Sequence, residues 1–420
     1  MILFLYNALI IPVLRIVVRC ALFINPKLRE REESWKTTIT CIPSHPENYR
    51  RIWFHVASMG EFEQAKPIIE LLKKDNPELS IIVSFFSPSG YRNQKNYPLA
   101  DAVVYMPFDT RKKARQFIEA INPDVVVFIR YELWLNHLAE LSQWKIPVYL
   151  FCATFPNSSI WNYPVFRSAL HRILNYFTEI YTVSQRETNL FLSINTTTPI
   201  ISSVDTRFDR IISVIENSQK ESPILPDNYF KPDDIVLVAG STWQPDEEIL
   251  IKAFHSLEQQ GHSIRSIIVP HEPTPEHTQA LKNNLRDSVL LSEINGKNSD
   301  ARHTIVDSIG KLLKLYSYAD IVYVGGGFGA GVHSTAEPAG YGVPLVSGRN
   351  ISRSPDAQNL VTLEALTCIN SSNELTEWLL KMVNDESERL KRGELSRQYV
   401  YKGLGGSKTA AEIIANYLKS

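Results

Sequence analysis

Glycines, hydroxyl groups and one carboxylate follow an apolar segment in the second half of the chain. Residues 324–344 read VGGGFGAGVHSTAEPAGYGVP and begin where the expected strand 320–324 ends. Glycines let the backbone approach a ligand closely, and the N-terminus of a helix suits a phosphate group. A glutamate in that helix can accept hydrogen bonds from two ribose hydroxyls. The pattern favours a nucleotide-sugar pocket over the alternative of an ordinary Gly-rich surface loop. The candidate contacts are Gly326, Gly327, His333, Ser334 and Glu337.

Two further carboxylates come just after expected strands in the first half of the chain. Glu61 closes the motif SMGE after the strand 52–57, and Glu132 follows the strand 124–129. Because the carboxyl ends of parallel strands meet at one edge of a sheet, both acids are expected at the same rim. A glutamate there can serve as the general base for an acceptor hydroxyl. Each is equally well explained as an acid that stabilises the start of a helix.

Other polar side chains near strand ends leave two explanations open. Ser241 and Thr242 follow the strand 235–239 and can either cap the next helix or bind a phosphate. His271 is a phosphate contact, a base or an ordinary loop histidine. Arg207 lies where the chain crosses between two expected domains, and it can form a bidentate contact with an anion or a hinge salt bridge.

The elements that must position these residues alternate between strand and helix. Continuous apolar strands separated by helices are typical of parallel, doubly wound sheets. A polar, proline-containing stretch interrupts the alternation, so we expect two Rossmann-like domains that face a cleft. The expected strands are 52–57, 80–86, 102–105, 124–129, 146–151, 179–183, 235–239, 264–269, 288–291, 321–324 and 344–346. The expected parts are an anchor helix 1–24, a first domain 25–205, a linker 206–233, a second domain 234–404 and a final helix 405–420 that packs back on the first domain.

Composition narrows the class of protein. The formal net charge of −1 argues against a nucleic-acid binder, which would carry a basic excess. The four cysteines form no CxxC pair, so neither a zinc site nor a disulfide framework is expected. This cysteine usage fits a reducing compartment.

The first 24 residues differ from the rest of the sequence. They are apolar except for Asn7, Arg15 and Arg19, and further basic residues follow. The two arginines are four residues apart and share one helical face. We expect a retained membrane anchor, spanning the bilayer or lying in its interface, with the following domain kept on the cytoplasmic side. The alternative is an amphipathic helix packed on the protein's own core.

Taken in order, the motifs resemble those of the 3-deoxy-D-manno-octulosonic acid (Kdo) transferases of lipopolysaccharide synthesis, over nearly the full length of the chain. They are Ser58-Met59-Gly60-Glu61, Glu132-Leu133-Trp134, Arg207-Phe208-Asp209, Gly240-Ser241-Thr242 with Glu247-Glu248, and Glu337-Pro338-Ala339. The resemblance implies a GT-B glycosyltransferase at the bacterial inner membrane, with its catalytic domains on the cytoplasmic face. It implies inverting transfer of Kdo from CMP-Kdo to the lipid A precursor lipid IVA, without a metal or a cofactor.

The resemblance also implies residue roles. Glu61 would be the catalytic base, and Ser58, Gly60 and Glu132 would contact the acceptor. The donor contacts would be Arg207, Ser241, Thr242, His271, Gly326, Gly327, His333, Ser334 and Glu337.

Several positions depart from the family pattern. Asparagine is usual at Ser334, an Arg-His pair at His271-Glu272, and lysine is common at Arg207; Ser354 and Asp356 replace Phe and Glu. Two alternatives therefore stay open. One is a GT-B transferase or epimerase that uses a UDP- or GDP-sugar, and the other is a non-catalytic homologue that binds lipid A precursors.

Overall fold

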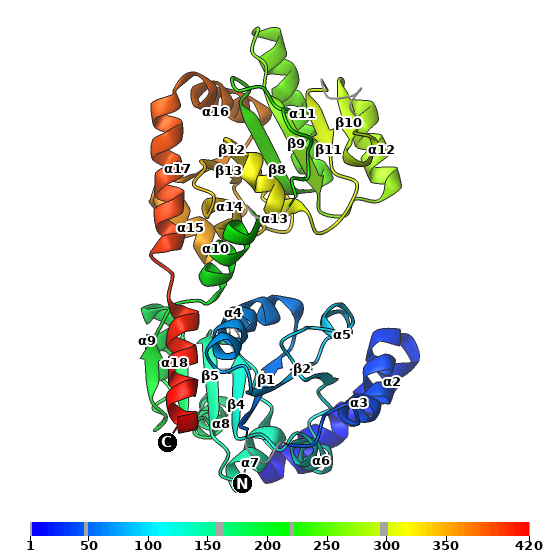
Figure 1. The fold of residues 1–420 in the computed structure, drawn as a ribbon, viewed down its shortest axis with the longest axis vertical. Helices are drawn as coiled ribbons and strands as arrows, with labels where there is room; N and C mark the ends of the chain where they lie inside the picture. The colour runs from blue at the N-terminus through cyan, green and yellow to red at the C-terminus, as the bar shows by residue number, and fades with distance from the viewer. Residues whose placement is uncertain (1, 46–48, 157–162, 219–221, 295–300, 420) are drawn as a thin grey trace. The chain divides into compact units, whose positions relative to one another are not determined.

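The computed structural model describes residues 2–45, 49–156, 163–218, 222–294 and 301–419 and divides the chain into two compact units (Figure 1). Unit 1 comprises residues 1–210 and 404–420, and unit 2 comprises residues 211–403. Each unit contains a seven-stranded parallel sheet with helices on both faces. The expected pair of Rossmann-like, doubly wound domains is therefore confirmed.

The sheet of unit 1 has the strand order β3-β2-β1-β4-β5-β6-β7. The order reverses direction between β1 and β4, which pair directly. Such a reversal is the topological switch point, beside which ligands bind in open parallel sheets. The strands are β1 (Arg51–Val56), β2 (Ser80–Phe85), β3 (Ala102–Tyr105), β4 (Val125–Ile129), β5 (Val148–Ala153), β6 (Glu179–Thr182) and β7 (Ile200–Ser202).

Alternate residues of β1 face two separate apolar cores. Phe54 packs with α4 and α18 on one face, whereas Trp53 packs with α6, α7 and α8 on the other. Both side chains are fully buried, as expected for a strand covered on both faces. The helices of this unit are α4 (Met59–Asp75), α5 (Pro88–Gln94), α6 (Arg111–Ile121), α7 (Leu135–Gln143), α8 (Pro164–Leu174), α9 (Gln185–Leu192) and α18 (Gly406–Lys419), and α10 (Arg207–Ser218) leads into unit 2.

The N-terminal segment is helical throughout its described length. It comprises α1 (Ile2–Leu5), the π-helix η1 (Tyr6–Ile10), α2 (Ile11–Ile24) and, after a cap at Asn25, α3 (Pro26–Ile39). The 22 residues Leu3–Ile24 have a mean hydropathy of 2.0 and are long and apolar enough to cross a membrane.

Two polar side chains of this segment contact the rest of unit 1. The Tyr6 hydroxyl donates to Asp109 at 2.9 Å, and the Asn7 amide donates to Asn136 at 2.8 Å. Most apolar side chains of the helix are exposed, with Ile16 at 64%. The alternative of an amphipathic helix packed on the protein's own core therefore fits the structure poorly.

The sheet of unit 2 has the order β10-β11-β9-β8-β12-β13-β14, with its switch point between β8 and β12. Its strands are β8 (Val236–Thr242), β9 (Arg265–Pro270), β10 (Ser288–Leu290), β11 (His303–Ile305), β12 (Ile321–Val324), β13 (Leu345–Gly348) and β14 (Leu366–Ile369). Its helices are α11 (Gln244–Gln259), α12 (Pro275–Asn284), η3 (Leu291–Glu293), α13 (Leu312–Leu315), η4 (Tyr316–Tyr318), α14 (Ala336–Ala339), α15 (Pro355–Thr362), α16 (Ser372–Asn384) and α17 (Glu386–Tyr401).

The structure differs from the sequence prediction in a few elements. The short strands β7, β11 and β14 were not predicted. The stretch 206–233, predicted as a linker, contains helix α10. Helix α7 begins at Leu135 rather than at Glu132, so Glu132 lies in the turn before the helix. The last helix, α18, contributes Ile414 to the core of unit 1.

Candidate functional site

The switch point of unit 1 brings the two predicted acids to neighbouring strands. Glu61 follows β1 and Glu132 follows β4, and these two strands pair with Ile52 opposite Val125. Both carboxylates are nearly enclosed, with Glu61 3% and Glu132 8% exposed. The expectation that they share one rim of the sheet is met within this unit.

Glu61 is held by the local sequence at the start of α4. Ser58 is the N-cap, and its hydroxyl accepts from the Glu61 N–H at 3.5 Å. In return, Glu61 Oε2 accepts from the backbone N–H of Ser58 at 3.2 Å and from that of Ala57. This is a capping box, so the helix-start explanation is correct for one carboxylate oxygen. The box fixes the rotamer of Glu61 and uses Oε2, not Oε1.

Glu132 is held by aromatic neighbours rather than by a helix. Its Oε2 accepts from the indole N–H of Trp134 at 2.5 Å and lies 3.4 Å from His55 Nε2. His55 is fully buried in β1. The explanation of Glu132 as an acid in the first turn of a helix is wrong, because α7 starts three residues later.

The surroundings of Glu61 raise the pKa of its carboxyl group. Burial is the main cause, and the charge of Glu132 adds to it. The Ala57 N–H, His55 and Arg130 act in the opposite direction but do not cancel the rise. A general base works best when its pKa lies nearer the operating pH than that of a free glutamate. The electrostatics therefore suit Glu61 for proton abstraction.

Gly60 is a glycine that the fold itself does not require. It is exposed, its φ lies outside the left-handed region, and a Cβ there would meet only Ser58 Oγ, at 3.9 Å. A glycine near a helix start costs stability relative to alanine.

In unit 2, Ser241 lies at the carboxyl end of β8, beside the switch point. It has φ = +53°, which is uncommon for a residue with a side chain, and the pairing of β8 with β9 shifts register there. Such strained residues cluster at ligand sites. Thr242, by contrast, is buried, and its hydroxyl donates to Glu247 at 2.9 Å. The two hydroxyls predicted as a pair thus have different surroundings.

The Gly-rich loop after β12 is tied to α11 through Asp246. One oxygen of Asp246 accepts from the Gly326 N–H at 2.9 Å, and the other accepts from the Tyr323 hydroxyl at 2.8 Å. Gly326 has φ = +88°, and a Cβ on Gly327 would lie 2.6 Å from the backbone of Gly348. Both glycines are therefore required by the loop itself. Glu337 lies in the short helix α14, which follows this loop.

Three aromatic rings stack at the same edge of unit 2. The ring centroids of His271 and His333 are 4.5 Å apart, and those of His271 and Trp243 are 4.6 Å apart. The Trp243 indole donates to His333 Nε2 at 2.9 Å. Burial, followed by the nearby His271, lowers the pKa of His333. The sequence prediction named both histidines but missed Trp243, although it directly follows Ser241-Thr242.

Two remaining predicted residues lie in different settings. Arg207 belongs to unit 1, whereas the other predicted donor contacts belong to unit 2. Its Nη2 lies 3.3 Å from Asp205 Oδ2, as the salt-bridge explanation anticipates. The Ser334 hydroxyl oxygen is enclosed and has no hydrogen-bond partner among the described residues.

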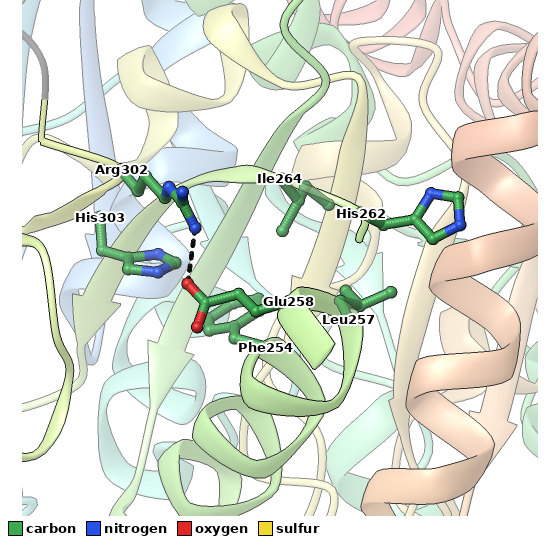
Figure 2. A pocket seen from close by; sticks show the side chains of 7 residues that line it. All are labelled: Phe254, Leu257, Glu258, His262, Ile264, Arg302 and His303. Atoms are coloured by element: carbon green, nitrogen blue, oxygen red, sulfur yellow. Dashed lines mark hydrogen bonds and ion pairs between the residues drawn. The ribbon is translucent and has the colours of Figure 1, made fainter. Parts of the chain in front are cut away.

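The cavity in Figure 2 lies at the opposite edge of the unit 2 sheet. It holds only about 10 Å³ and is lined by His303, which begins β11, and by Ile264, which precedes β9. Glu258 and Arg302 close it with an ion pair of 2.7 Å. Burial, with a smaller contribution from nearby arginines, lowers the pKa of His303 to about 3. These residues are at the amino ends of the strands and are separate from the candidate site.

Sequence comparisons give consistent family matches. The family described as "3-Deoxy-D-manno-octulosonic-acid transferase (kdotransferase)" matches residues 28–210. A 3-deoxy-D-manno-octulosonic acid transferase of Haemophilus influenzae is 23% identical, in an alignment that covers 88% of this chain and 87% of that protein. A probable mitochondrial enzyme of the same name from Arabidopsis thaliana is 26% identical, covering 84% of this chain and 81% of its own.

Solved structures confirm the fold class. UDP-GlcNAc 2-epimerase from Neisseria meningitidis superposes with a TM-score of 0.61 at 15% identity, over 88% of this chain and 100% of its own. MurG from Acinetobacter baumannii superposes with a TM-score of 0.54 at 13% identity, over 87% and 99% of the two chains. At this identity the likeness establishes the GT-B fold of the chain and nothing about its substrate.

Proposed function

We propose that this chain is a member of the Kdo transferase family of glycosyltransferases, and that it moves Kdo from CMP-Kdo to a lipid A precursor with Glu61 as the general base. The observation that carries the proposal is the pair of buried acids at the switch point of unit 1. Glu61 and Glu132 both lie within the segment 28–210 that matches the family.

The proposed reaction is a direct displacement. Glu61 takes the proton of the acceptor hydroxyl while that oxygen forms a bond to the anomeric carbon of Kdo. The bond from this carbon to the phosphate oxygen breaks, and CMP leaves with the electron pair. Attack opposite the leaving group inverts the anomeric centre. The raised pKa of Glu61 supports this role, since a more basic carboxylate accepts the proton more readily.

The proposed acceptor contacts surround Glu61. Ser58 positions the base through the capping box, and Gly60 leaves room for the sugar ring. Glu132 would accept a hydrogen bond from an acceptor hydroxyl through the oxygen that Trp134 does not use. These three residues would form the acceptor side of the site in unit 1.

The proposed donor contacts lie mainly in unit 2. Ser241 would donate to the CMP phosphate, and Glu337 would accept from the ribose hydroxyls. We propose contacts by the loop residues Gly326, Gly327, His333 and Ser334, by the backbone of Thr242, by His271, and by Arg207 of unit 1. Donors fixed in place before reaction stabilise the charge that develops on the leaving phosphate.

The apolar helix Leu3–Ile24 is consistent with association with a membrane, where the lipid acceptor would be. We propose that the chain acts at the cytoplasmic face of the bacterial inner membrane. The exposed apolar side chains would enter the bilayer, and Arg15 and Arg19 would face anionic headgroups.

The decisive experiment is transfer from freshly generated CMP-Kdo to a tetraacylated lipid A precursor in detergent micelles, read by mass spectrometry of the lipid. A mass gain of one or more Kdo units supports the proposal. Glu61→Gln should lose about 10²- to 10⁴-fold in rate while CMP still protects the protein against thermal unfolding. Protection by UDP or GDP instead of CMP would favour another nucleotide sugar, and lipid binding without turnover would favour a non-catalytic homologue.

A further inference from the structure

A chain of buried polar groups leads to Glu132 from the interior of the unit 1 sheet. The Trp53 indole N–H lies 2.8 Å from Ser84 Oγ, which lies 2.8 Å from His55 Nδ1. On the other side of the ring, His55 Nε2 lies 3.4 Å from Glu132 Oε2. Trp53, His55 and Ser84 are each 0% exposed. None of these three was predicted as a site residue, because within a buried strand each has the appearance of core.

The donors and acceptors in this chain have one consistent direction. An indole N–H can only donate, so Ser84 Oγ accepts from Trp53. Within the described residues, the Ser84 hydroxyl has one other partner, His55 Nδ1. The hydroxyl hydrogen is therefore directed to Nδ1, which must be the unprotonated nitrogen. In a singly protonated His55 ring the proton is then on Nε2, the atom that faces Glu132.

This arrangement concentrates N–H groups on one oxygen of Glu132. Oε2 accepts from Trp134 Nε1 and faces His55 Nε2, whose hydrogen-bonding capacity is otherwise unused among the described residues. Other charged groups nearby are Glu61, whose carboxyl interacts with both Glu132 and His55, and Arg130. The Trp134 N–H and the His55 ring, both on the side of Oε2, orient the carboxylate and leave Oε1 for another partner.

We propose that His55 is a positioning residue for the transferase reaction, with its proton fixed on Nε2 by Ser84 and directed at Glu132. This inference rests on the proposed function, since it assigns to His55 the task of orienting the acceptor-side carboxylate. His55 touches neither substrate. It orients Glu132, and the ring itself partly counters the rise in the pKa of Glu61.

The test compares three substitutions in the full chain. His55→Phe keeps an aromatic ring against Phe128 and Trp134 but removes both nitrogens. His55→Gln restores an N–H donor that can reach toward Glu132. Ser84→Ala removes the hydrogen that selects the tautomer. His137→Asn is the matched control. Like His55, His137 packs against Trp53 and Trp134, but it pairs with Asp109 at 2.7 Å.

His55→Phe should lower kcat/KM for Kdo transfer by about 10- to 100-fold, the range for losing one hydrogen bond to a charged group. The acidic limb of its pH profile for kcat/KM should move to higher pH, because His55 counters the rise in the pKa of Glu61 and the variant loses that effect. His55→Gln should recover most of the rate and the original limb. Equal losses in His55→Phe and His137→Asn, with unmoved limbs, would show that His55 only fills space.

A second measurement does not depend on turnover. ¹⁵N spectra of histidine-labelled protein, with His55 assigned by its loss in His55→Gln, should show the ring proton on Nε2 and not on Nδ1. Ser84→Ala should populate the other tautomer. A ring protonated on Nδ1 in the wild type would overturn the inference even if Kdo transfer is confirmed. A wild type that has the Nε2 proton but transfers no Kdo would instead refute the proposed function alone.

Discussion

Glu61 and Glu132 follow the strands β1 and β4, which pair directly. The charge of Glu132 raises the pKa of the buried Glu61 carboxyl group. The two acids are 71 residues apart in the sequence. Only the crossover of the sheet makes them neighbours. Like charges in one enclosed site resist simultaneous ionisation, which is a recurrent way of tuning a base.

Removing the charge of Glu132 should make Glu61 a weaker base. In Glu132→Gln the amide oxygen still accepts from Trp134, but burial is then the main remaining cause of the raised pKa of Glu61. The acidic limb of kcat/KM for Kdo transfer should therefore move to lower pH. Glu63→Gln is the control, because Glu63 lies in α4, as Glu61 does, but pairs with Lys66 and Arg210. An unmoved limb in Glu132→Gln would mean that the acids are not coupled.

Glu61 should also cost stability at neutral pH. Its folded pKa is raised, so its contribution to folding is fully present below the unfolded pKa and is lost as pH rises through the folded pKa. Glu61→Gln keeps an oxygen for the capping box and never ionises. The variant should melt above wild type at about pH 8, with the difference vanishing toward about pH 4. Differential scanning fluorimetry across this pH range measures it, and a lower melting temperature at every pH would contradict it.

Gly60→Ala should separate folding from catalysis. Because the backbone is compatible and the space is open, the added methyl should stabilise the fold by about 0.4–1 kcal/mol. Transfer should fall, through a raised KM for the lipid acceptor. At Gly90, a Cβ would lie 2.5 Å from Phe85, so Gly90→Ala should instead destabilise by about 1–3 kcal/mol. Unchanged acceptor kinetics in Gly60→Ala would remove this residue from the acceptor site.

Substitutions of Ser241 and Thr242 should affect different properties of the protein, although the two residues are adjacent. Thr242→Val leaves Glu247 without its hydroxyl partner and should cost about 1–3 kcal/mol in unfolding free energy. Ser241→Ala should leave stability nearly unchanged but weaken binding of CMP, since the Ser241 hydroxyl is proposed to contact the phosphate. Urea unfolding and calorimetric titration with CMP distinguish the two effects. Equal CMP affinity in Ser241→Ala and wild type would refute that contact.

The apolar N-terminal helix should direct the protein to lipid. Ile16→Asp introduces a charge on its exposed face and should reduce sedimentation with anionic vesicles without lowering the melting temperature. Leu390 is also 64% exposed but lies in α17, so Leu390→Asp is a matched control that should sediment like wild type. Equal vesicle binding by both variants would contradict the anchor proposal.

The sequence reveals the strands of the two sheets more readily than their order. Continuous apolar runs such as 124–129 are recognisable because both faces of a parallel strand are buried. Strand β11 escapes this reasoning, since its three residues His303–Ile305 include two polar ones. Glu61 is recognisable at a strand end, but its proximity to Glu132 depends on the pairing of β1 with β4, which no local pattern encodes.

The hydrogen-bond and ion-pair partners of the site's side chains are not predictable from the sequence. Thr242 and Ser241 look alike in sequence, and only the position of Glu247 shows that the threonine hydroxyl is already used. Arg207 likewise has a carboxylate neighbour in Asp205. His55 is overlooked because a histidine in an apolar strand gives no sign of what its two nitrogens face.

The division of unit 1 into two chain segments has a consequence for synthesis. Its core includes Ala410 and Ile414 of α18, packed with residues of β1 and α4, and α18 follows all of unit 2 in the chain. A ribosome therefore releases the central strands and α4 long before α18, the helix that packs against them. Until then, the apolar surface of α4 and its sheet is exposed to aggregation or to chaperones. Unit 2 is one continuous segment, 211–403, so the unit whose synthesis begins first is completed last.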